Sequence, residues 1–214
     1  MATSARKPLS RERILARALA LADEQGLEAI TMRRLGEDLG YEAMSLYRHV
    51  ENKDDVINGM LDLVLAEWEP PAPGPDWRAA VRASAITVHD ALRRHPWAAS
   101  VMLDARHARP ARMAYGERLL ACLRENGFSA ERTYAVYHLI DGHIFGFSRW
   151  EIAHAWLPAD IEARLPQLIA AIDWSAAPYF AEHRDQHFTD GPHRDANAFE
   201  LGLDLILAGL SPDG

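Results

Sequence analysis

The stretch ITMRRLGEDLGYEAMSLYRHVENK, residues 30–53, holds two short helical patterns around a tight turn. Thr31 is a good helix cap, leucines then recur at helical spacing, and Gly40 can take the positive φ that reverses the chain. A second helix is expected over Ala43–Val50. With a supporting helix before it, the pair predicts a helix-turn-helix motif.

Helical patterns continue on both sides of this motif. Ser10 can cap a first helix that ends before Gly26, and Asn52 can cap a fourth helix with acidic residues in its first turn. The run EPPAPGP, residues 69–75, cannot continue a helix because proline lacks an amide donor. After Asp76, which can also cap a helix, further helices are expected over residues 77–94, 97–105, 110–126, 130–156, 159–173, 176–184 and 195–210. The predicted fold class is therefore all-α.

The proline-rich run also divides the chain into domains. We expect a three-helix helix-turn-helix domain at residues 1–53, a connecting helix at 54–69, a linker at 70–76 and a larger helical domain at 77–214. The 214 residues are 49% hydrophobic and 25% charged, which is typical of a soluble globular protein. This composition excludes a disordered or fibrous chain.

The formal net charge of −8 alone argues against a nucleic-acid partner, because phosphates repel an acidic surface. The charges are unevenly distributed, however. Five cations stand between Arg6 and Arg17 against the single acid Glu12, and the acidic excess lies in residues 54–214. The N-terminal domain can therefore approach DNA although the whole chain is acidic.

Cysteine content and hydropathy bear on the compartment. The single cysteine, Cys122, permits no intrachain disulfide and no cysteine-rich zinc site. No uncharged apolar run reaches the ~18 residues of a membrane span, and residues 1–9 lack the apolar core of a signal peptide. We expect a soluble, cytoplasmic protein without a membrane partner.

The outward side of the second helix is polar and aromatic in a way that suits DNA. Small side chains at Ala43 and Ser45 would let the start of the helix lie deep in a major groove. Tyr47, His49 and Lys53 have the reach to donate hydrogen bonds to phosphate oxygens. The simpler alternative for Tyr47 is packing on its own helix.

Residues 30–41 and 44–53 together resemble the DNA-binding signature of the TetR family of transcriptional repressors. The similarity is unbroken over about residues 10–65, and the run from Leu46 to Lys53 is its most specific part. Three later segments resemble the regulatory domain of the subgroup that contains the tetracycline repressor: His95-Pro96-Trp97, residues 125–129 and residues 199–205.

The resemblance implies which residues contact DNA. Base edges would be read by Arg33, Ala43, Met44, Ser45 and Arg48. The DNA backbone would be held by Thr31, Tyr47, His49 and Lys53. Arg33 and Arg48 are the candidates for guanine, each worth ~1–3 kcal/mol of discrimination. Ala43 and Met44 differ from the residues of the tetracycline repressor, so its operator sequence does not carry over.

Two helices of the second half, over residues 134–155 and 199–210, are apolar nearly all round. One buried face cannot explain this, so each is expected between its own core and a partner subunit. The family resemblance implies a four-helix bundle across a two-fold axis. The expected dimer residues are Ile144, Phe147, Leu203, Ile206, Leu207 and Leu210.

The resemblance also indicates an effector pocket in the second half. The candidate lining residues are Trp97, Met102, His107, Met113, Tyr115, His138, Asp141 and Phe145. An aromatic cavity with a few polar groups suits a small amphipathic ligand. The simpler alternative for His138 and Asp141, three residues apart, is that they satisfy each other or a backbone group.

Two further patterns bear on metal chemistry. By the resemblance, Leu103 stands where the tetracycline repressor has its metal-coordinating histidine, with His107 one turn later, so tetracycline is not the expected effector. His183 and His187 have the i, i+4 spacing of zinc ligands, with His193 behind them. A solvated polar connection explains this cluster more simply, so we expect no metal and no cofactor.

The sequence thus favours a homodimeric repressor that a small-molecule effector releases from a palindromic DNA operator. A DNA-binding regulator without an effector is the first alternative. A small helical hydrolase or metal enzyme is the second, but no nucleophile motif or glycine-rich phosphate loop supports it and no catalytic residue is assigned.

Overall fold

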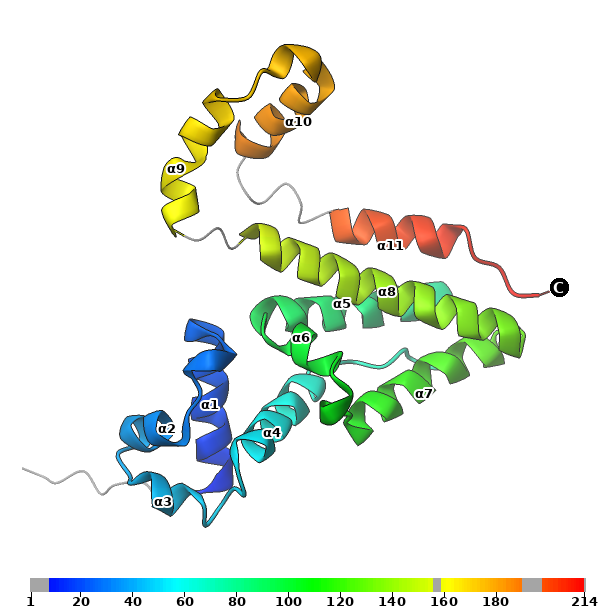
Figure 1. Cartoon of the computed structure of the whole chain (residues 1–214). Helices are drawn as coiled ribbons and strands as arrows, with labels where there is room; N and C mark the ends of the chain where they lie inside the picture. Colours follow the sequence, from blue (N-terminus) through cyan, green and yellow to red (C-terminus); the bar gives the residue numbers. More distant parts are fainter. Residues whose placement is uncertain (1–7, 156–158, 190–197, 214) are drawn as a thin grey trace, which may run out of the picture. The chain divides into compact units, whose positions relative to one another are not determined.

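The structure is a computed structural model that describes residues 8–155, 159–189 and 198–213 (Figure 1). Every described element is helical, which confirms the all-α fold class. The α-helices are α1 (Arg11–Gln25), α2 (Met32–Leu39), α3 (Ala43–Leu46), α4 (Lys53–Leu65), α5 (Trp77–Arg94), α6 (Ala98–Met102), α7 (Pro110–Glu125), α8 (Ala130–Ala155), α9 (Ala159–Ala170), α10 (Pro178–Thr189) and α11 (Ala198–Ala208). Short 3-10 helices η1, η2 and η3 lie at Leu27–Ala29, Ala105–His107 and Trp174–Ala176. Contacts divide the chain into two compact units, Met1–Asn126 and Gly127–Gly214.

The first helices begin where the sequence places their caps. Ser10 Oγ accepts the amide of Arg13, and Thr31 Oγ1 accepts the amide of Arg34 at 3.1 Å. Asn52 and Asp76 cap α4 and α5 in the same way. These bonds satisfy amides that have no partner within the helix, so the four expected starts are confirmed.

Glycines allow α2 and α3 to approach closely. Gly40 ends α2 in the left-handed conformation, with φ of 74°. Gly36 is buried, and a Cβ there would lie 2.7 Å from the carbonyl oxygen of Tyr41. The two helices of the motif are thereby held in a fixed geometry around the buried Leu46.

Helix α4 links the helix-turn-helix to the rest of the first unit. It packs on α1 and also contacts α6 and α7. Its buried residues include Val56, Met60 and Val64. At Gly59 the two helices are so close that a Cβ would lie 2.7 Å from Leu15 Cδ1. A movement of α4 would therefore reach α1 directly.

In the second unit, α8 packs beside α11 (Figure 1). His143 on α8 stacks on Phe199, with ring centroids 4.9 Å apart, and its Nε2 lies 2.9 Å from the Phe199 carbonyl oxygen. A Cβ at Gly202 would lie 2.6 Å from His143 Cε1. The absence of a side chain at Gly202 therefore allows α8 and α11 to approach closely within one chain.

Several expected helices differ in extent from those observed. The connecting helix expected over 54–69 ends at Leu65, the helix expected over 159–173 ends at Ala170, and the helix expected over 176–184 extends to Thr189. The helix after the turn was expected to reach Val50 but ends at Leu46, because the next residues turn toward Asn52, the cap of α4. The expected helix over 97–105 is divided into α6 and η2, where Asp104 accepts the amide of Arg106. The helix expected from 176 begins at Pro178, whose ring suits the first turn.

Candidate DNA interface and ligand-binding region

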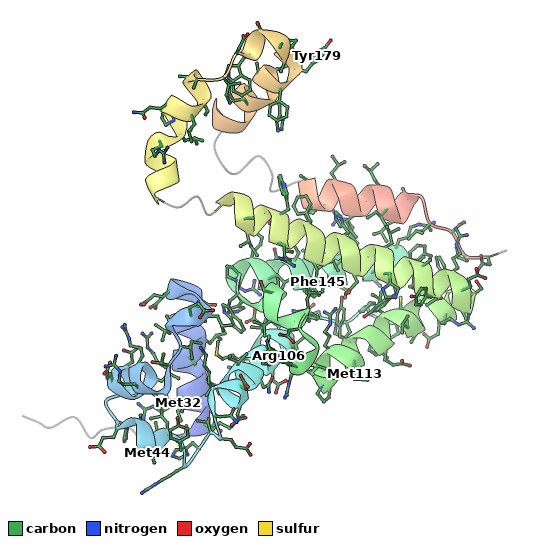
Figure 2. The ribbon with its side chains drawn as sticks, in the orientation of Figure 1. Met32, Met44, Arg106, Met113, Phe145 and Tyr179 are labelled. Carbon is green, nitrogen blue, oxygen red and sulfur yellow. The ribbon has the colours of Figure 1, made fainter. Side chains whose placement is uncertain are left out.

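Helix α3 and the two residues after it expose three of the predicted DNA contacts to solvent. Met44 is 74% exposed, Tyr47 is 45% exposed and Arg48 is also exposed. Figure 2 labels Met44 on this helix. The four remaining candidates next to these residues are half-buried: Ala43, Ser45, His49 and Lys53. Because Leu46 is fully buried, the helix has one side fixed to the protein and the other side free for a ligand.

The arginines of α2 are engaged in surface ion pairs. Arg33 Nη1 lies 2.7 Å from Glu37 Oε1, one turn along the helix. Asp38 is held between Arg34, at 3.0 Å, and Arg17 of α1, at 2.7 Å. Exposed pairs of this kind contribute little free energy. Arg33 can therefore exchange Glu37 for a DNA base at small cost.

Arg11 and Asp55 form a two-pronged ion pair between the starts of α1 and α4. The guanidinium of Arg11 reaches both carboxylate oxygens of Asp55, at 2.7 and 2.6 Å. Arg11 also donates to the carbonyl of His49, and Asp55 accepts the amide of Glu51. The hydrogen bond from Arg11 lowers the pKa of Asp55 to about 2. The pair thus positions the segment directly after α3.

Asp23 ties the other end of α1 to the corner between α5 and α6. Its Oδ1 accepts the indole Nε1–H of Trp97 at 2.8 Å and lies 2.9 Å from Nδ1 of the buried His95. The other ring nitrogen of His95 lies 3.0 Å from Glu67, just after α4. Burial acts to raise the pKa of Glu67, but hydrogen bonds from Arg94 and His95 hold it below its usual value.

Two more hydrogen bonds join α4 to the segment directly before α7. Arg109 Nε donates to Asp62 at 2.8 Å, and His107 Nδ1 lies 2.9 Å from Asn58 Oδ1. The helix that follows the DNA-binding motif therefore touches the predicted ligand-binding region through charged and polar side chains as well as through its apolar core. A shift of residues 95–109 would act on α4 from two sides.

An aromatic and polar cluster lies between α4, α5 and α7. Tyr115 hydroxyl is 2.8 Å from Ser84 Oγ, and the Tyr115 ring meets the buried Trp68 edge-on, with centroids 5.1 Å apart. The Arg112 guanidinium lies 5.8 Å from the Trp68 ring. This cluster offers a hydroxyl, a cation and two aromatic faces.

The other candidate pocket residues differ in how far they are buried. Trp97, Met102 and Phe145 are buried, and Trp97 uses its indole N–H on Asp23. Met113 is 74% exposed, so it adds nothing to the buried core of the first unit (Figure 2). On α8, His138 is exposed and contacts the rings of Tyr134 and Tyr137, while Asp141 is half-buried.

The dimer candidates also divide into two sets. Ile144, Leu203 and Leu207 are buried within the single chain, while Phe147, Ile206 and Leu210 are half-buried. The large hydrophobic residues that α8 and α11 expose include Leu139, Trp150, Leu201 and Leu205, and the last two are 62% and 68% exposed. Spacing along the sequence cannot distinguish two sides of a helix that is apolar all round.

The described part of the chain contains neither a cluster of metal ligands nor a membrane-spanning helix. No three His, Cys, Asp or Glu side chains in that part of the chain are grouped so that they could hold a metal ion. His193 and the side chain of His187 lie outside the described residues. None of the described helices combines the length and apolar character that a membrane crossing needs.

Two family models together account for nearly the whole chain. The model of the tetR family of bacterial regulatory proteins matches residues 14–60, and that of the tetracyclin repressor-like C-terminal domain matches residues 70–212. The chain belongs to the TetR family. It is a DNA-binding transcriptional regulator, and its C-terminal domain is a ligand-binding domain like that of the tetracycline repressor.

Relatives and solved structures agree with this membership. The HTH-type transcriptional repressor DrrR1 of Streptomyces coeruleorubidus is 32% identical over 94% of this chain and 77% of its own. The class D tetracycline repressor protein of Escherichia coli is 32% identical over 93% of both chains. The crystal structure of ActR from Streptomyces coelicolor in complex with actinorhodin has a TM-score of 0.69 and 27% identity, covering 95% of this chain and 97% of that one.

Several residues that organise this TetR-family protein were not singled out from its sequence. Arg11, Asp23 and Asp55 are charged residues of helices, where such residues are usually solvated. Nothing in the sequence shows that Arg11 pairs with Asp55, 44 positions away, or that Asp23 contacts His95, 72 positions away. His95 was noticed only as part of a family-like segment, and Trp97 was expected to line the effector pocket. Ser84 carries no sequence signal, because a serine within a helix is usually solvated.

The Arg11–Asp55 pair makes folding of this TetR-family protein sensitive to acid. The pKa of Asp55 is about 2 in the folded chain against a usual 3.8, so the stabilisation is full above pH 4 and is lost as pH falls through 2. We expect Asp55→Asn to lower the free energy of unfolding by about 1–2 kcal/mol at pH 7, and the deficit to narrow below pH 4. Urea unfolding followed by circular dichroism measures both.

Asp104→Asn is the matched control. The pKa of Asp104 is also about 2, owing to Arg106. That pair is two residues apart and lies at the surface, so it can also form in the unfolded chain, and we expect it to contribute little to the folding difference. Equal effects of the two substitutions would contradict the role assigned to the Arg11–Asp55 pair.

Proposed function

We propose that this TetR-family protein is a homodimeric repressor that binds a palindromic operator and is released by a small-molecule effector. The observation that carries the proposal is the outward side of α3 and of the turn after it, where Met44, Tyr47 and Arg48 are exposed beside the buried Leu46. The curated relatives named repressors support the direction of the regulation. The functional domains proposed are residues 1–53 for DNA, 54–69 as connecting helix, 70–76 as linker and 77–214 for the effector and the dimer.

DNA contact would divide between two groups of residues. Arg33, Ala43, Met44, Ser45 and Arg48 would meet base edges, while Thr31, Tyr47, His49 and Lys53 would meet phosphates. Thr31 Oγ1 already accepts the Arg34 amide, so its hydroxyl hydrogen is the group left for a phosphate. Because the N-terminal domain is only weakly cationic, non-specific attraction to DNA should be modest and these contacts should supply most of the affinity.

We expect the full-length protein to select a palindrome from random DNA duplexes, in a complex that weakens with salt. Lys53→Ala should weaken binding to all sequences and reduce the slope of log K against log salt by ~1 for each half-site. Arg48→Ala should cost ~1–3 kcal/mol per half-site and relax preference at one base pair. Electrophoretic mobility shifts at several salt concentrations measure both effects.

Arg118→Ala, which removes an exposed cation of α7, is the control and should leave the salt slope unchanged. Failure of the unmodified protein to select any palindrome would refute operator binding.

The dimer would form through α8 and α11. Leu201 and Leu205 lie one turn apart on α11, and Leu139 and Trp150 expose further apolar surface on α8. A second copy would bury this surface, with Phe147, Ile206 and Leu210 at its margin. A dimer would also place two recognition helices to meet successive major grooves, ~34 Å apart.

We expect the unmodified protein to elute as a dimer in size-exclusion chromatography with light scattering. Leu205→Glu should give a monomer, because it would bury two charges at a two-fold interface. Met113→Glu introduces the same charge at an equally exposed apolar position of α7 and should leave the dimer intact. A dimeric Leu205→Glu variant would contradict this interface.

The effector would bind in the region between α4, α5, α6 and α7. Tyr115, Ser84 and Arg112 supply polar groups beside the aromatic face of Trp68. A ligand that displaced residues 95–109 would act on α4 through Asn58, Asp62 and Glu67. Release from DNA would then follow from the ligand's greater affinity for the displaced arrangement. Trp97, Met102, His107, Met113, His138, Asp141 and Phe145 remain further candidates for effector contact.

Actinorhodin, the ligand in one of the similar structures, is the first probe. We expect it to raise the melting temperature with concentration and to release the operator, because a ligand of the native state stabilises that state. Tyr115→Phe removes the hydroxyl and should reduce the shift. Tetracycline should give none, because Leu103 offers no metal-binding nitrogen. Release by tetracycline, or no release by any aromatic probe, would count against this site.

A further inference from the structure

Met44 is the second residue of α3, and its side chain is 74% exposed (Figure 2). A single exposed apolar residue is ordinary on a protein surface. Its place is what matters, because the first residues of a recognition helix are those that meet base edges in the major groove. If an apolar side chain at that point covers a polar base edge, that edge loses water without gaining a hydrogen bond, whereas contact with an apolar group carries no such cost.

The frame behind Met44 is rigid. The amide of Tyr41 donates to the Gly36 carbonyl at 2.8 Å, and the amide of Ser45 donates to the Glu42 carbonyl at 2.9 Å. These bonds and the buried Leu46 fix the backbone that carries Met44. The thioether side chain itself has three rotatable bonds, so it can adapt to a nearby surface without movement of the helix.

The major groove offers one apolar group that a side chain can contact, the C5-methyl of thymine. A thioether donates no hydrogen bond and accepts only weakly, so Met44 cannot read guanine, adenine or cytosine through their polar edges. Its neighbours Ala43 and Ser45 are small and half-buried, so they do not hold it away from the groove. Glu42, at the start of the helix, is exposed and would repel phosphates.

We propose that Met44 is a specificity-determining residue that reads a thymine methyl group in each operator half-site. This inference rests on the proposed function, because it takes α3 to be the helix that enters the major groove. The operator would therefore carry a thymine at a fixed place in each half-site, and that preference would come from contact with an apolar group without any hydrogen bond. Arg48 and Arg33 would read neighbouring base pairs by hydrogen bonds.

The test uses the operator that the full-length protein selects. Each thymine is replaced in turn by deoxyuridine, which removes only the methyl group and keeps base pairing. We expect affinity to fall about fourfold per half-site at one thymine position, as the loss of one buried methyl group implies. Met44→Ala should bind the thymine and uracil duplexes at that position equally. Arg48→Ala, the matched control in the turn directly after the same helix, should keep the fourfold difference.

The outcomes separate the inference from the function on which it rests. Operator binding without sensitivity to uracil at any position overturns the inference and leaves the proposed function standing. Uracil sensitivity that persists in Met44→Ala assigns the methyl contact to another residue and also overturns it. Failure to select an operator overturns both. The uracil series on the unmodified protein needs no variant to fold.

Discussion

Helix α1 is held at both ends by charged side chains, and the DNA-binding half of the molecule depends on that attachment. At its start, Arg11 pairs with Asp55 of α4, beside the segment that follows the recognition helix. At its far end, Asp23 accepts from Trp97 and lies against His95 at the α5–α6 corner. Between them, Leu15 packs on Gly59 so closely that a Cβ at Gly59 would lie 2.7 Å from Leu15 Cδ1. A displacement of α4 would therefore act directly on α1 and on the segment that leads from the recognition helix.

This arrangement explains how an acidic chain can be a DNA-binding protein. Acidic side chains of the first four helices are used as partners for arginines: Asp38 binds Arg17 and Arg34, and Glu37 binds Arg33. Helix α3 and the turn after it expose instead the apolar Met44, the aromatic Tyr47 and the cationic Arg48. Affinity for DNA then depends on shape and on specific contacts more than on net charge, which is consistent with the net charge of −8.

Local features of the fold were predictable, and features that depend on distant residues were not. The caps Ser10, Thr31, Asn52 and Asp76 were predicted because each acts on an amide three residues away. The end of α3 was placed four residues too late, because the chain there follows the start of α4. Among the proposed dimer residues, Leu203 is buried and Leu205 is exposed, a difference set by the packing of α11 on α8.

The sequence by itself determined the all-α class, the helix-turn-helix, the family and the outward position of Met44 and Arg48, because these follow from spacing, caps and local motifs. Only the tertiary structure decided which carboxylates hold α1 in place and which side of α11 is left free. It also decided that Tyr115 joins Ser84 and Trp68. Those choices unite residues up to 74 positions apart, and their energies come from burial and pairing that exist only after the helices have packed.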